Sequence, residues 1–209
     1  MGKDDEMILV VKRSRLNELG AFEGLCFEPA RYIESFFTPG QNFFTRRGEA
    51  EVNPELKQII PYVVFTHAGK VLRYVRGGSS GEKRLVAKAS IGIGGHVNDS
   101  DGAGYSLETY HRAVCREIAE ELQIEDAWQE RIIALINDES GEVGRVHLGI
   151  VHIAELQSAK ISPGEEAIDN LEFLSIPEIR TQMESLETWS QMLVSNEKFL
   201  AQIGSCPGC

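Results

Sequence analysis

The sequence has no apolar run that approaches the roughly 20 residues needed to cross a bilayer as a helix. Its first residues, MGKDDEMILVV, are acidic, and their apolar part is too short for a secretory signal peptide. Glu6 stands where a myristoylation signal carries serine or threonine. The absence of these three signals predicts a cytoplasmic protein that does not act on a membrane.

Cysteine is scarce, with four in 209 residues. Cys26 and Cys115 are isolated, and we expect each to be a single buried thiol. Cys206 and Cys209 form a C-x-x-C pair at the C-terminus, a spacing found in zinc sites and redox pairs. Because the sequence has no second such pair and no redox-fold context, we favour a frayed terminal segment over half of a metal site.

Basic residues are also few, because 21 Lys and Arg face 32 Asp and Glu, which gives a net charge of −11. This balance argues against non-specific binding to a nucleic-acid polymer or an anionic membrane. Nucleotides are not excluded, because a bound metal ion can supply positive charge locally. The length suits one hydrophobic core with room for a small extra subdomain.

The most informative segment runs from Gly102 to Ile124 and contains three closely spaced glutamates, Glu117, Glu120 and Glu121. If this segment is helical, the three carboxylates fall within about 100° of arc. A separate apolar stripe consists of Leu107, Val114, Ile118 and Leu122. The helix would therefore turn one face to the core and offer a dense negative face, on which a divalent cation such as Mg²⁺ converts repulsion into attraction.

This pattern resembles the signature of the Nudix hydrolase family: glycine, five residues, glutamate, seven residues, then Arg-Glu-aliphatic-x-Glu-Glu-x-Gly-aliphatic. The positions that fit are Gly102, Glu108, Arg116, Glu117, Ile118, Glu120, Glu121 and Ile124. Gln123 replaces the last glycine, which removes no catalytic group but predicts a small loss of stability. The family also carries a Gly-Gly pair before the spacer. We therefore take Gly95 of the upstream Gly94-Gly95 pair as the structural equivalent, with an insertion over residues 98–105.

The resemblance implies a role for each signature residue. Glu117, Glu120 and Glu121 would hold Mg²⁺, with Mn²⁺ as the alternative ion, and Glu117 would also help to activate the attacking water. The carbonyl of Gly95 would add a backbone ligand. Arg116 would orient the carboxylates through hydrogen bonds. Glu108 lies on the other side of the helix by angle, in its first turn, and is expected to have a structural role.

Four further residues are weaker candidates for contact with substrate. Glu165 and Glu166 lie in a later acidic segment from which some family members supply a general base. His96 follows the glycine pair, and Arg84 belongs to a basic set with Arg73, Arg76 and Lys83. For each of them ordinary loop charge or loop packing is an equally serious interpretation. His147 and His152 lie five apart on one predicted strand and so face opposite sides.

The order of elements predicts an α/β fold, and the resemblance specifies an α/β/α sandwich with a mixed sheet and an N-terminal extension. Strands are expected at 7–11, 62–66, 71–75, 85–93, 128–137, 146–156 and 171–174. Helices are expected over the signature, after Ser175 with Pro177 at the first helical position, and at 184–202. We divide the chain into an N-terminal extension (1–57), a hydrolase domain (58–203) and a tail (204–209).

The function implied is Mg²⁺-dependent hydrolysis of a diphosphate linkage in a nucleoside diphosphate joined to another moiety, X. Two alternatives remain: an isomerase acting on a diphosphate substrate with the same fold, which needs a cysteine beside a buried substrate, and a non-catalytic module that senses a nucleotide. The expected partner is a small diphosphate molecule. A homodimer is left open, with the N-terminal extension as a candidate contact.

Overall fold

The computed structural model describes residues 2–76, 88–102, 106–164 and 168–204. Contacts divide the chain into two compact units. Unit 1 consists of Met1–Tyr62, Gly94–Glu117 and Ile132–Val151, and unit 2 of Val63–Ile93, Ile118–Arg131 and His152–Cys209. Each unit combines paired strands with helices, which confirms the α/β class predicted from the sequence.

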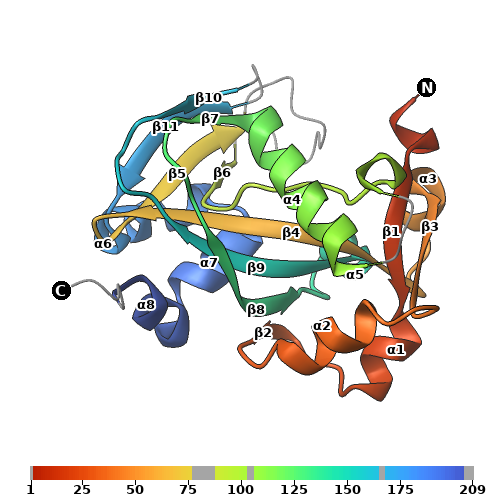
Figure 1. Ribbon diagram of the computed structural model, residues 1–209. Helices are drawn as coiled ribbons and strands as arrows, with labels where there is room; N and C mark the ends of the chain where they lie inside the picture. The colour runs from red at the N-terminus through yellow and green to blue at the C-terminus, as the bar shows by residue number, and fades with distance from the viewer. Residues whose placement is uncertain (1, 77–87, 103–105, 165–167, 205–209) are drawn as a thin grey trace. The chain divides into compact units, whose positions relative to one another are not determined.

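Unit 1 contains several strands and parts of strands. They are β1 (Met7–Lys12), β2 (Gly24–Cys26), β3 (Asn42–Arg46), most of β8 (Glu130–Asn137) and the first parts of β4 (Leu56–His67) and β9 (His147–Glu155). β1 lies between β3 and β4, with Val10 opposite both Phe43 and Gln58, and β1 and β3 are seen side by side in Figure 1. β2 pairs with β8.

Helical segments surround these strands. They are η1 (Lys3–Asp5), α1 (Arg13–Glu18), α2 (Ala30–Phe36), α3 (Arg47–Ala50), η3 (Asp99–Asp101), α5 (Glu142–Val146) and the greater part of α4 (Leu107–Glu121). The core beside β1 contains Ile8, Val10, Ala50 and Leu56, with Phe43 packed against them. β-Branched residues in an uninterrupted apolar run explain why β1 forms a strand that is buried on both faces.

Unit 2 begins with the second part of β4, which forms a hairpin with β5 (Lys70–Arg76). Ala68 and Gly69 turn the chain with positive φ values of 49° and 74°, the geometry of the two-residue turns that join twisted strands. β5 also pairs with β6 (Ala89–Ser90) and β11 (Ile168–Leu174), while β7 (Leu122–Ile124) pairs with β10 (Ile161–Pro163).

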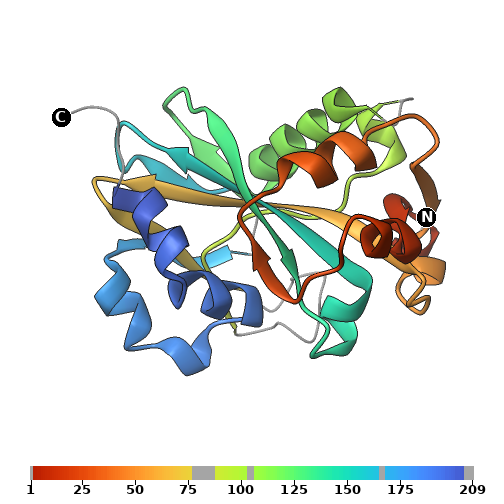
Figure 2. The ribbon, with the colours of Figure 1, turned by 90° about the horizontal axis from the view of Figure 1, so that it is seen from below.

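The C-terminal part of unit 2 is helical. Its elements are α6 (Ile176–Arg180), η4 (Met183–Ser185), α7 (Thr188–Val194) and α8 (Glu197–Gly204). α6 packs on α7 and α7 on α8, which Figure 2 shows in blue. The single helix predicted at 184–202 is wrong, because Asn196 interrupts it and its Oδ1 accepts a hydrogen bond of 2.9 Å from the Lys198 amide. Ser175 caps α6 as predicted, and Pro177 lies in its first turn.

Other predictions are confirmed or corrected at single elements. The strands predicted at 7–11, 62–66, 71–75 and 171–174 are present with longer bounds, and those predicted at 128–137 and 146–156 are present with shorter bounds. Of the strand predicted at 85–93, Ala89–Ser90 forms β6, and 85–87 lie outside the described residues. Cys115 is exposed, not buried. The three-part domain division stays a prediction. Among the described residues, no helix is long and apolar enough to span a membrane.

A buried lysine links three parts of unit 1. Lys57 on β4 is fully buried, and its Nζ donates to the carbonyls of Gly144 (3.2 Å) and His147 (3.3 Å) and pairs with Glu139 at 2.8 Å. Burial lowers the pKa of Lys57, and the hydrogen bond that Lys57 donates to Glu139 opposes that shift. Burial raises the pKa of Glu139, but hydrogen bonds from Arg13 and Lys57 outweigh this effect and leave that pKa lowered.

Replacing Glu139 should therefore produce a pH-dependent loss of stability. The folded pKa of Glu139 lies below its ordinary value of 4.5, so its contribution is present above that pH and disappears as the pH falls through the folded pKa. We expect Glu139→Gln to lower the free energy of unfolding by about 2 kcal/mol near neutral pH and by much less near pH 3. Denaturant titrations over this range measure the difference.

Glu125→Gln is the matched control, because Glu125 pairs with Lys160 where both side chains are exposed. An exposed pair of this kind contributes about 1 kcal/mol or less. A loss in Glu139→Gln that stays the same from neutral to acid pH would contradict the assignment of the lowered pKa.

Candidate active site on helix α4

Helix α4 begins immediately after Ser106, whose Oγ accepts a hydrogen bond of 3.3 Å from the Thr109 amide. This confirms Ser106 as the capping residue. Of the predicted apolar stripe, Val114, Ile118 and Leu122 are buried, but Leu107 is 37% exposed. The buried stripe fixes the rotation of α4, so the side chains of Glu117, Glu120 and Glu121 belong to a different face of the helix.

Arg116 is the most highly connected side chain of α4. Its Nε and Nη2 donate to the two carboxylate oxygens of Asp101, at 2.6 and 2.9 Å. Nη1 donates to Glu117 at 2.8 Å, and Nη2 also donates to the carbonyl of His96 at 2.9 Å. Burial opposes the charge of Arg116, but the hydrogen bonds to Asp101 and the nearby Glu117 outweigh it and raise the pKa. The guanidinium therefore stays charged and fixes the Glu117 carboxylate.

Gly95 lies directly against that carboxylate. A Cβ added at Gly95 would stand 2.3 Å from Oε2 of Glu117, so any other residue there would force that carboxylate to move. Gly102, in contrast, has a φ of 162°, which is extended backbone, and a Cβ there would meet the hydroxyl of Thr109. The geometry thus favours Gly95 as the counterpart of the signature glycine.

The C-terminal end of α4 is held by Gly164. The Gly164 amide donates to the carbonyl of Glu121 at 2.8 Å, and a Cβ on Gly164 would lie 2.5 Å from the Glu120 carbonyl. The chain then passes straight into β7, where Gln123 pairs with Ser162. Gln123 is not among the described non-glycine residues with positive φ, so no glycine is required there and the predicted loss of stability has no basis in the backbone.

These residues provide a donor set that suits a hard divalent cation. Three carboxylates occupy five positions on one helix, and a side chain on Gly95 would overlap one of them. Carboxylate and carbonyl oxygens are the ligands that Mg²⁺ and Mn²⁺ take in proteins. The residues present therefore fit the metal that the resemblance implies, and their individual roles stay predictions.

The remaining predicted site residues are placed as follows. His96 Nε2 hydrogen-bonds to Gln58 at 2.8 Å, and burial, followed by Arg47, His147 and Arg116, lowers its pKa, so its imidazole is neutral. Glu108 is exposed and pairs with Arg112, as expected for a structural residue. Arg84, Glu165 and Glu166 lie outside the described residues.

Two features of the site were missed by sequence analysis. Asp101 is buried and anchors Arg116, although its only local signal is the pairing with Asn98 in a capping box around η3. The second feature is a cluster beside His96, in which Glu51 and His147 join it from distant parts of the sequence. Neither is visible in a motif, because both depend on contacts between remote segments.

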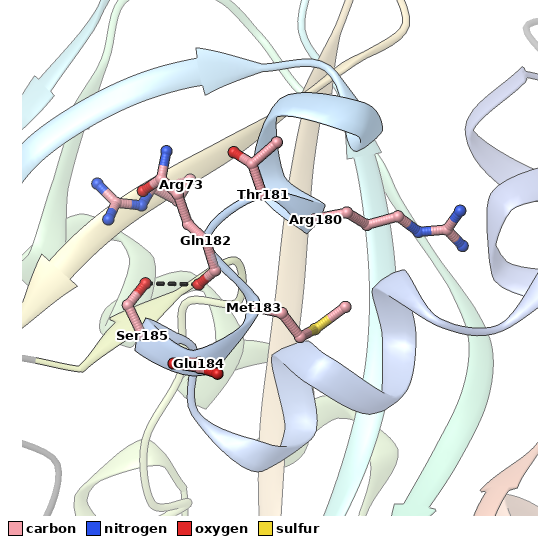
Figure 3. Close-up of a pocket in the computed structure, with 7 residues that line it drawn as sticks. All are labelled: Arg73, Arg180, Thr181, Gln182, Met183, Glu184 and Ser185. Carbon is pink, nitrogen blue, oxygen red and sulfur yellow. Dashed lines mark hydrogen bonds between the residues drawn. The ribbon is translucent and has the colours of Figure 1, made fainter.

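Unit 2 contains a cavity beside Arg73, one of the basic residues considered above as a phosphate contact. Figure 3 shows its lining, which consists of Arg73, Arg180, Thr181, Gln182, Met183, Glu184 and Ser185. Arg73 pairs with Glu172 at 3.2 Å, and the Arg180 Nε donates to the carbonyl of Val194 at 2.9 Å. Both guanidinium groups already have protein partners, so this cavity is a poor candidate for an anion site.

Comparisons with known proteins were made on the whole chain. No family model matches it. Protein YmaB of Bacillus subtilis (strain 168) is 37% identical over 202 residues, which are 93% of this chain and 98% of that protein. The solved structure of Tm1382, a protein assigned to the Nudix hydrolases, shares 32% identity with a TM-score of 0.75, and the match covers 91% of this chain and 97% of that one.

A more distant structure shows the fold alone. DR0079 from Deinococcus radiodurans shares 18% identity with a TM-score of 0.52, over 73% of this chain and 90% of its own. These matches agree with the α/β/α sandwich expected from the sequence. The match to Tm1382 takes in most of the segment before residue 58, since only 9% of this chain is left uncovered.

The anchoring of Arg116 can be tested at Asp101. Asp101→Asn halves the bidentate interaction and leaves a buried amide group beside a half-buried guanidinium, so we expect the free energy of unfolding to fall by about 2–3 kcal/mol. Asp99→Asn is the matched control, because Asp99 lies in the same short helix but is exposed. Urea denaturation measures both variants. Equal stabilities for the two would show that Asp101 does not anchor Arg116.

Proposed function

The chain belongs to the Nudix hydrolase family and is an enzyme of the Nudix pyrophosphohydrolase type, and from this premise we propose that it uses Mg²⁺ to hydrolyse a diphosphate linkage in a nucleoside diphosphate joined to a second moiety, X. Mn²⁺ is the alternative ion. The products are a nucleoside monophosphate and phosphorylated X, or orthophosphate where X is minimal. The proposed partner is this small molecule, with neither a nucleic-acid polymer nor a membrane involved.

The observation that carries the proposal is the contact between Gly95 and Glu117. A glycine is needed there because the carboxylate occupies the space of a side chain, and Arg116 fixes that carboxylate from the other side. Because an arginine and a glycine both constrain this glutamate, its carboxylate is held in one position, as metal binding requires. A solvated helix face needs no such constraint.

Each residue has a distinct proposed role. Glu120 and Glu121 would hold the ion together with Glu117 and the Gly95 carbonyl. When bound, the ion neutralises phosphate charge and lowers the pKa of water. Glu117 would accept a proton from the attacking water, helped by its position beside Gly95. Arg116 would keep Glu117 ionised and oriented through the hydrogen bond of 2.8 Å, and Asp101 would keep Arg116 in place.

Two alternative functions have less support. An isomerase with this fold needs a cysteine beside a buried substrate, and Cys115 is exposed on α4. A non-catalytic sensor needs none of the glutamates, yet all three are present with the supporting arginine and glycine. The cytoplasmic location and the homodimer also remain proposals.

The first experiment is hydrolysis of a panel of nucleoside diphosphate derivatives, with and without Mg²⁺. Replacing Glu120 or Glu121 with Gln should lower kcat by about 10²-fold or more, since each removes charge from the metal site, and Glu117→Gln should cost a similar or slightly smaller factor. The measurement is kcat for each variant at saturating Mg²⁺. Glu108→Gln is the control on the same helix, because Glu108 is exposed and paired with Arg112.

The same series locates the general base. We expect Glu165→Gln and Glu166→Gln to cost much less than Glu117→Gln. A loss of about 10²-fold at either of them, with near-normal turnover in Glu117→Gln, would move the base from α4 to the later segment. Turnover that is insensitive to both Mg²⁺ and the three α4 glutamates would sink the proposed mechanism.

A separate test compares the two candidate glycines. Gly95→Ala places a Cβ 2.3 Å from Oε2 of Glu117 and must displace it, so we expect weaker Mg²⁺ binding and a loss of kcat of about 10²-fold. Gly102→Ala meets the rotatable hydroxyl of Thr109 at 2.8 Å and the flexible end of Arg112 at 3.2 Å, and should be tolerated. Isothermal titration with Mg²⁺ and kcat distinguish the two. A loss confined to Gly102→Ala would reverse the alignment of the signature.

A further inference from the structure

Three metal-binding side chains from distant segments meet in unit 1. Glu51 ends α3, His96 follows Gly95, and His147 begins β9. One carboxylate oxygen of Glu51 and one ring nitrogen of each histidine all lie within 4.8 Å of one another. His147 is buried, and Glu51 and His96 are half-buried. None of the three belongs to the signature on α4.

Hydrogen bonds orient both imidazole rings. His147 Nδ1 lies 2.6 Å from the carbonyl of Val143, which can only accept, so Nδ1 carries the proton and Nε2 has the lone pair in the neutral ring. His96 Nε2 lies 2.8 Å from the amide oxygen of Gln58, which leaves the lone pair on Nδ1. Histidines that bind metals almost always donate their second N–H to an oxygen in this way.

The partners of the two histidines are themselves firmly placed. Gln58 and Lys57 are adjacent on β4 and fully buried. Gln58 contacts the His96 ring, while Lys57 Nζ donates to the carbonyl of His147 at 3.3 Å. One buried strand therefore holds both histidines, and their ring centroids are 5.7 Å apart. Metal sites in proteins commonly have a second layer of contacts of this kind, which orients the ligands.

The net charge around Glu51, His96 and His147 is also compatible with the binding of a cation. Arg47 lies 3.6 Å from Glu51 and 3.2 Å from Glu6, so one guanidinium is shared by two carboxylates. Glu6, Arg47 and Glu51 together carry one net negative charge. Glu6 and Arg47 also line an open cavity of about 460 Å³, which gives solvent access to the partner of Glu51.

We propose that Glu51, His96 and His147 bind one transition-metal ion, Zn²⁺ by preference, at a site separate from the α4 glutamates. Two imidazoles and one carboxylate suit Zn²⁺ better than Mg²⁺. Metal–ligand bonds of about 2.0–2.1 Å place tetrahedral ligands roughly 3.3 Å apart, so ligand atoms that lie within 4.8 Å of one another move together by no more than about 1.5 Å when the ion binds. Three protein ligands leave one position for water or another oxygen ligand.

The experiment is Zn²⁺ binding to the full chain carrying Glu120→Gln and Glu121→Gln, in excess Mg²⁺, so that the oxygen-rich site on α4 does not contribute. Isothermal titration and metal content after dialysis should both show one Zn²⁺ per chain. Adding His147→Asn or Glu51→Gln should weaken binding by about 100-fold or more, because removing an outer-layer partner alone costs 10–100-fold. His67→Asn is the matched control, since His67 Nδ1 also hydrogen-bonds to a carbonyl but lies outside the cluster.

A second variant separates a metal site from a structural cluster. Gln58→Met keeps the buried volume but removes the acceptor that orients His96, so Zn²⁺ binding should weaken by about 10–100-fold while the three ligands remain. Circular dichroism of the metal-free proteins verifies folding. Failure of the folded Glu120→Gln/Glu121→Gln chain to bind Zn²⁺, or unchanged binding after His147→Asn and Glu51→Gln, overturns the proposal. Hydrolysis of nucleoside diphosphate derivatives by the chain without substitutions is assayed separately. The proposed Zn²⁺ site and the proposed hydrolase function can therefore fail independently.

Discussion

The ordering of Glu117 in the candidate site depends on the guanidinium of Arg116. It joins three elements between residues 96 and 117: α4 through Glu117, the short η3 through Asp101, and the peptide after Gly95 through the carbonyl of His96. Glutamates close together on a helix repel one another, and without an external anchor they would occupy many rotamers. A charged, half-buried, multiply bonded arginine removes that freedom for Glu117, so this carboxylate is ordered during folding.

Strand β4 makes the second contribution to order. It is buried along its length in unit 1, yet it carries Lys57 and Gln58 side by side, and both would be costly without partners. Their partners are the carbonyls of Gly144 and His147 and the ring of His96. A polar pair of this kind specifies how the chain before β9 and the loop after Gly95 are placed, which apolar residues at the same positions could not do. Stability and site geometry therefore depend on the same two residues.

The sequence predicted those parts of the site that are local. The glutamates, Arg116 and the apolar stripe lie on one helix, so their spacing alone reveals the pattern, and the hairpin after β4 is equally local. Asp101 escaped prediction because its partner lies 15 residues away, across a segment with no regular period. The cluster of Glu51 with the two histidines escaped because it requires strand pairing to bring remote segments together. The long final helix was overpredicted because the capping by Asn196 competes with an otherwise helical pattern.

The two candidate metal sites differ in a way that follows from their donors. The α4 site offers oxygens only, and hard ions such as Mg²⁺ exchange at such sites and bring phosphates with them. The cluster of Glu51, His96 and His147 offers two nitrogens whose protons are already assigned by carbonyl and amide oxygens, which suits a more firmly held ion. His96 immediately follows Gly95, and Arg116 donates hydrogen bonds to both the His96 carbonyl and the Glu117 carboxylate. A movement of His96 would therefore be transmitted to Glu117 through Arg116. An ion held by His96 would therefore stabilise the loop that positions Gly95, and the two sites would be coupled through backbone geometry without sharing a ligand.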